Sequence, residues 1–70
     1  MDNLLHQLEH FLLRNSRDCQ LILGVGYTSY IDMKSGRRPI PPYVENHVRT
    51  LLLLDAEHVN LVVRERLSGR

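Results

Sequence analysis

The chain has 70 residues, a net charge of +1 and 43% hydrophobic residues. A chain of this length forms one domain with a limited core, and this composition excludes a wholly disordered protein. No apolar run is long enough to span a bilayer, and the first residues lack the apolar core of a signal peptide, so we expect one cytoplasmic domain over residues 1–70.

Apolar residues at three- and four-residue spacing predict a first amphipathic helix over residues 3–14, capped by Asp2 or Asn3. Asn15 or Ser16 can cap a second short helix that runs to Leu23. The expected N-caps therefore divide this part of the chain into two short helices.

A glycine turn and a polar helix follow. Gly24-Val25-Gly26 stops the second helix, because glycine accepts the positive φ of a tight turn. In a third helix from Tyr27 to Ser35, Tyr30 and Met33 can face inward. The outer face then carries Tyr27, Thr28, Ser29 and Asp32.

Two further helices are predicted after Gly36. Prolines 39, 41 and 42 prevent the third helix from continuing, and Pro42 suits the first position of a fourth helix. Asp55 can cap a fifth. The inner stripes of these two helices are Val44, Val48, Leu51 and Leu52, and then Val59, Val62, Val63 and Leu67.

Leucines in excess of these stripes indicate a subunit interface. Leu53, Leu54 and Leu61 extend the apolar surface beyond one helical face, so we expect a homodimer formed through the last two helices. The alternative is a closely packed monomer core.

Few residues suggest other chemistry. Cys19 has no second thiol and is expected to be buried, while His6 and His10 have helical zinc-site spacing without a third ligand and are expected to be surface residues. We predict no metal, no cofactor and no enzymatic activity, because no nucleophile, base and orienting residue share a motif.

The order of turn, short helix, serine-glycine stop and two arginines predicts a helix-turn-helix. With Gly24-Val25, Ser35-Gly36 and the run from Arg37 to Tyr43 at this spacing, the sequence resembles the Cro/C1-type (Xre-like) regulators of phages and mobile elements. The resemblance covers about residues 15–54. It implies a compact all-α bundle of five helices with a central helix-turn-helix, the lambda-repressor-like fold.

The resemblance also implies a role for each matching position. The third helix would enter the major groove of double-stranded DNA, with base contacts from Tyr27, Thr28, Ser29 and Asp32. Phosphate contacts are expected from Lys34, Ser35, Arg37, Arg38 and Tyr43. The expected function is a homodimeric repressor on a two-fold operator, at another promoter or at its own (autoregulatory), with no small-molecule effector.

Three residues differ from the family pattern. Gln20 replaces a small alanine, which predicts looser packing of the two motif helices or a changed angle between them. Tyr30 replaces a β-branched residue and needs a hydroxyl partner if buried, and Gly26 replaces a serine or threonine cap.

A different class of function fits the near-neutral charge. A small helical adaptor, chaperone or antitoxin-like protein would bind another polypeptide through its leucine-rich surface. It gives no reason for the glycine turn and adjacent arginines. DNA binding that falls steeply with salt would separate the two hypotheses.

Overall fold

The computed structural model describes residues 3–68, and the chain forms five helices within this range. They are α1 (Leu4–Leu12), α2 (Ser16–Leu23), α3 (Tyr27–Ser35), α4 (Pro42–Leu53) and α5 (Ala56–Ser68). Residues 3–68 contain no strand, so the prediction of an all-α protein with five helices is confirmed. None of these helices combines the length and the apolar character needed to cross a membrane.

The helices begin where the sequence places their capping residues. Asn3, Asn15 and Asp55 each accept a backbone N–H bond from the first turn of α1, α2 and α5, respectively. Pro42 is the first residue of α4. The alternative cap of α1, Asp2, lies outside the described residues.

The end of α1 differs from the prediction. The helix stops at Leu12 rather than near Arg14, because Leu13 adopts the left-handed conformation with φ 55° and ψ 42°. The backbone N–H groups of Leu13 and Arg14 both donate to the Glu9 carbonyl, which closes the helix. Leu13 therefore fills the position after a helix that glycine usually occupies.

Two of the glycines end helices as predicted, and a third does not. Gly24 and Gly36 have φ values of +75° and +89°, and they end α2 and α3. Gly26 has φ −67° and ψ 149°, an extended conformation that any residue adopts. The turn therefore needs only one left-handed glycine, and the prediction for Gly26 was wrong.

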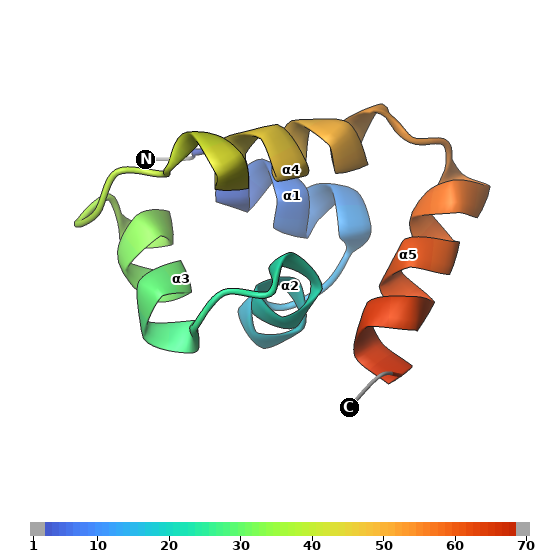
Figure 1. Cartoon of the computed structure of the whole chain (residues 1–70), viewed down its shortest axis with the longest axis horizontal. Coiled ribbons are helices and arrows are strands. Elements are labelled where there is room, and N and C mark those ends of the chain that lie inside the picture. Colours follow the sequence, from blue (N-terminus) through green and yellow to red (C-terminus); the bar gives the residue numbers. More distant parts are fainter. Residues whose placement is uncertain (1–2, 69–70) are drawn as a thin grey trace.

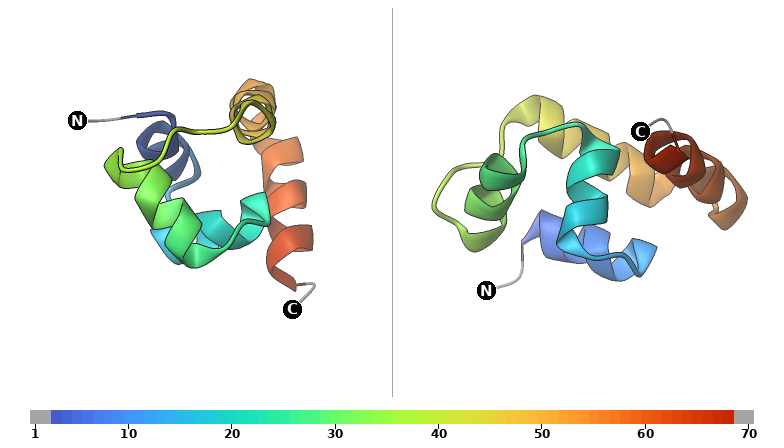
Figure 2. Two further views of the ribbon diagram at one scale, coloured as in Figure 1. Left: turned by 60° about the vertical axis from the view of Figure 1, so that its left-hand side comes forward. Right: turned by 90° about the horizontal axis from the view of Figure 1, so that it is seen from below.

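The helices surround one core. α1 packs along α4, α2 lies beneath both, and α3 and α5 pack against opposite sides of α2 (Figures 1 and 2). The buried side chains are Leu5, Leu8, Cys19, Ile22, Leu23, Tyr30, Met33, Val44, Val48, Leu51, Val59 and Val63. The predicted inward positions of α3, α4 and α5 are confirmed, except that Leu52, Val62 and Leu67 are only partly buried. Helix α3 lies at one end of the molecule.

Candidate nucleic-acid interface

Helix α3 is attached to the core along one side only. Tyr30 and Met33 are buried, whereas Tyr27 and Thr28 are exposed and Ser29 and Asp32 are half-buried. The four residues predicted to read bases therefore retain access to solvent. They supply one phenol, two hydroxyls and a carboxylate, all of which can form hydrogen bonds.

The first residue of α3 lies against an arginine of α2. The guanidinium carbon of Arg17 is 4.7 Å from the centre of the Tyr27 ring, a cation–π contact. Arg17 was not among the residues predicted from the sequence. In the sequence, Arg17 is distinguished only as a basic residue in the first turn of α2. The turn between α2 and α3 brings it beside Tyr27.

The two loop arginines lie beside the residues that precede them in α3. Arg38 donates from its guanidinium to the Ser29 Oγ at 3.0 Å, and from its backbone N–H to the Asp32 carbonyl at 3.2 Å. Arg37 forms an ion pair with the Asp32 carboxylate at 3.8 Å, with 80% of the Arg37 side chain exposed. The interface thus contains two exposed cations near the C-terminal end of α3.

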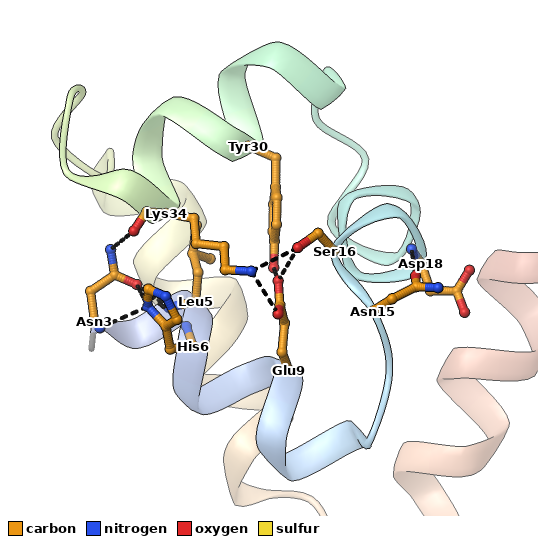
Figure 3. Close-up of polar contacts among 9 residues, drawn as sticks. All are labelled: Asn3, Leu5, His6, Glu9, Asn15, Ser16, Asp18, Tyr30 and Lys34. Carbon is orange, nitrogen blue, oxygen red and sulfur yellow. Dashed lines mark hydrogen bonds and ion pairs between the residues drawn. The ribbon is translucent and has the colours of Figure 1, made fainter. Parts of the chain in front are cut away.

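Lys34 does not join these arginines. Its Nζ donates to the Glu9 Oε1 at 3.0 Å and to the Ser16 Oγ at 2.8 Å, on the side of α3 that faces α1 (Figure 3). The expected positive cluster of Lys34, Arg37 and Arg38 is therefore reduced to the two arginines. The ammonium is already paired with a carboxylate of the same chain.

Ser35 and Tyr43 lie on the exposed surface near the arginines. The Ser35 Oγ donates to the Asp32 carbonyl at 3.2 Å, and Tyr43 projects from the first turn of α4. A surface hollow separates the α2–α3 turn from α4. Its lining includes Gly24, Gly26, Ser29, Arg38 and Tyr43.

Gln20, one of the three residues that differ from the Cro/C1-type pattern, forms a hydrogen bond across the α2–α3 turn. Gln20 donates from its side-chain amide to the Val25 carbonyl at 2.7 Å. An alanine cannot make this bond. The amide therefore connects α2 directly to the segment that leads into α3, a contact that the expectation of looser packing did not foresee.

The buried Tyr30 hydroxyl has a partner on α1. It donates to the Glu9 Oε2 at 2.6 Å. Burial, and then this bond to an anionic acceptor, raises the pKa of Tyr30 far above its usual value. Partial burial opposes ionisation of Glu9, but hydrogen bonds from Tyr30, Ser16 and Lys34, together with the Lys34 charge, bring the pKa of Glu9 below its usual value.

The described residues offer no alternative chemical site. Burial, and then the Glu9 charge, raises the pKa of the Cys19 thiol to about 11, which makes it a poor nucleophile. His6 is half-buried rather than a free surface residue, and its Nδ1 accepts a bond from the Asn3 backbone N–H. Within residues 3–68 no three His, Cys, Asp or Glu side chains are grouped to hold a metal ion.

Apart from Tyr27 and Tyr43, exposed large apolar side chains occur at two kinds of place, the predicted subunit-interface positions and a groove. Leu53 and Leu61 are 86% and 52% exposed, whereas Leu54 packs partly against the core. The second place, which the sequence did not predict, is a groove between the end of α1 and the start of α5. Its lining includes Phe11, Leu13, Leu54 and Val59.

No family model, curated protein or solved structure matches this chain.

Proposed function

We propose that the protein is a helix-turn-helix transcription regulator that binds double-stranded DNA through α3. The observation that carries the proposal is the position of α3. One side of it is held by the core, the other side is polar and accessible, and arginines lie at both of its ends. A helix with its side chains is about 10–12 Å in diameter, which suits a major groove about 12 Å wide.

The proposed contacts divide into two kinds. Arg37 and Arg38, with Arg17 at the other end of α3, would neutralise phosphates and fix the register of the protein on DNA. Ser35 and Tyr43 would add neutral phosphate contacts. Because the structure pairs Lys34 with Glu9, the proposal does not assign Lys34 a phosphate.

Base reading would come from the accessible face of α3. Thr28 offers a hydroxyl and a methyl group, Ser29 a hydroxyl and Tyr27 a phenol, while Asp32 can accept from cytosine N4. Asp32 and Ser29 now contact Arg37 and Arg38. When the arginines move to phosphates, these two acceptors become free for the bases.

A single short helix reads only a few base pairs, so the proposed active species is a homodimer on a two-fold operator. Binding of this kind at a promoter would block transcription. The proposed role is therefore a small repressor, and control of its own promoter is one form of it.

The test begins with selection of bound duplexes from a random library, followed by fluorescence anisotropy at several salt concentrations. Replacing Arg37 and Arg38 with alanine should weaken binding and reduce the salt slope by about 1.8, since each phosphate contact contributes about 0.9. Replacing Thr28 with alanine should instead change the preferred sequence.

The matched control is the double variant Arg49→Ala/Arg64→Ala, which removes two exposed charges from α4 and α5. It should leave both the salt slope and the preferred sequence close to those of the unmodified protein. Failure of the unmodified protein to bind any selected duplex would overturn the proposal. An equal effect of the control variant would show that only net charge matters.

The apolar groove favours a second candidate function, an adaptor that binds another polypeptide. Phe11 and Leu13 are exposed beside the groove, and large apolar side chains that gather on a surface are typical of a site where another protein binds. This candidate predicts no salt-dependent duplex binding. The same anisotropy experiment therefore distinguishes the two functions.

A further inference from the structure

Apolar packing alone holds α3 weakly. Only Tyr30 and Met33 among its nine residues are buried. Ile31 packs against the core only partly, and a helix attached through so few apolar side chains can still tilt or rotate. Polar contacts with α1 and α2 must therefore contribute to its orientation.

One carboxylate on α1 makes several of these contacts. The Glu9 Oε2 accepts from the Tyr30 hydroxyl at 2.6 Å, and the Glu9 Oε1 accepts from the Lys34 Nζ at 3.0 Å (Figure 3). Tyr30 and Lys34 are four residues apart and lie one above the other on the same face of α3. Glu9 thus contacts α3 at two successive turns.

The same carboxylate contacts the start of α2. The Ser16 Oγ donates to the Glu9 Oε2 at 2.7 Å and accepts from the Lys34 Nζ at 2.8 Å. Ser16 is the first residue of α2. Three helices therefore meet at Glu9, and each oxygen of its carboxylate has at least one donor.

A second polar contact holds the end of α3. The Asn3 side-chain amide donates to the Met33 carbonyl at 2.8 Å and to the Lys34 carbonyl at 3.1 Å. Its oxygen caps α1, and Figure 3 shows this cap and the bond to Lys34. These carbonyls belong to the last turn, where a helix lacks internal donors. With Glu9 near the middle and Asn3 at the end, the contacts fix both the tilt and the rotation of α3.

The Glu9 contacts are partly shielded from solvent. The Glu9 and Lys34 side chains are only 16% and 25% exposed. Charge-assisted hydrogen bonds in such surroundings are stronger and more directional than those at an open surface. An exposed pair such as Arg49 and Glu45 lacks this protection.

We propose that Glu9 is the positioning residue of the DNA-binding surface: its carboxylate sets the direction in which α3 presents Thr28 and Asp32, without touching the partner. The expected effect of Glu9 on DNA binding rests on the proposed function. Its structural part, the control of the orientation of α3, does not depend on DNA.

The experiment uses Glu9→Gln and Tyr30→Phe, which remove the charge or the hydroxyl with little change in shape, and the exchange Glu9→Lys/Lys34→Glu. Backbone residual dipolar couplings report the orientation of α3 relative to α1 and α4. Duplex selection and anisotropy report the preferred sequence, the affinity and its salt slope.

We expect reoriented α3 couplings in Glu9→Gln, and affinity for the selected operator about tenfold lower, comparable to the loss of one base contact. The salt slope should remain, because the phosphate contacts persist. Tyr30→Phe should change the couplings in the same direction, and the exchange variant should not recover the original preference, because an ammonium at position 9 cannot accept from the Tyr30 and Ser16 hydroxyls. The matched control Glu45→Gln, which loses an exposed carboxylate on α4, should change neither measurement.

Unchanged couplings in folded Glu9→Gln and Tyr30→Phe would overturn the inference, even if the unmodified protein binds DNA. If the couplings show a reoriented α3 but the preferred DNA sequence is unchanged, the orientation set by Glu9 does not determine which sequence is recognised. Reoriented couplings in a protein that binds no duplex would contradict the proposed function while leaving the role of Glu9 in place.

Discussion

At the scale of single residues, Leu13 combines two unfavourable features. It is the only residue other than glycine with positive φ among residues 3–68, and its side chain is 85% exposed. A left-handed conformation costs an L-residue about 1–2 kcal/mol, because Cβ crowds the following carbonyl. The exposed side chain recovers little of this cost through packing within the chain.

Replacing Leu13 with glycine should therefore stabilise the protein. Relief of the strain exceeds the added entropy of the unfolded chain, so the free energy of unfolding should rise by about 0.5–1 kcal/mol. Urea denaturation measures this change. The control Leu13→Ala retains Cβ and should give no gain, and a loss of stability in Leu13→Gly would contradict the prediction.

At the scale of helices, α5 packs mainly against α2. Val59 and Val63 are buried, and the Arg66 guanidinium donates to the Ile22 carbonyl at 2.8 Å. That carbonyl lies at the C-terminal end of α2, where a cation is favourable because of the helix dipole. Partial burial, and then the charge of Arg66, lower the pKa of His47.

The variant Arg66→Met keeps the aliphatic stem and removes the donor and the charge. We expect the free energy of unfolding to fall by about 1 kcal/mol and amide hydrogen exchange in α5 to become faster. The pKa of His47 should rise toward its usual value, as NMR titration can show.

Arg64 provides the control for this measurement. It is exposed on the same helix, and its side chain makes no hydrogen bond with residues 3–68, so Arg64→Met should change stability by less than about 0.5 kcal/mol. Equal effects of the two substitutions would indicate that the contact with Ile22 does not hold α5 in place.

At the scale of the whole molecule, the small core buries little apolar surface, so self-association would stabilise the fold by burying more. The apolar candidates for an interface are Leu53 and Leu61 at the predicted positions, and Phe11 and Leu13 beside the groove. Leu54 is less available because it packs partly against the core. The predicted dimer therefore depends chiefly on Leu53 and Leu61.

Replacing Leu53 and Leu61 together with serine should weaken dimerisation about tenfold or more, since truncation of central apolar contacts has costs of this size. Sedimentation velocity over a range of concentrations measures the change, and circular dichroism checks the fold. The comparison variant Phe11→Ser/Leu13→Ser should leave the dimer intact. The opposite result would place the interface at the groove.

The sequence alone determined the helices, their starting points and most of the core. Caps such as Asn15 and Asp55, the helix stop at Gly36 and the inward positions of Tyr30 and Met33 follow from local rules, and the structure agrees with them. These features depend on residues a few positions apart. Helical spacing likewise placed Tyr27, Thr28, Ser29 and Asp32 on the accessible face of α3.

Only the tertiary structure decided which polar groups pair. Glu9 accepts from Tyr30 and Lys34, which follow it by 21 and 25 residues, and Arg66 reaches Ile22 across 44 residues. No helical period relates such positions, because their distances depend on how whole helices pack. Lys34, which the sequence assigned to a phosphate, therefore pairs with Glu9 in a partly buried contact, and Arg17, which the sequence did not single out, lies at the candidate interface.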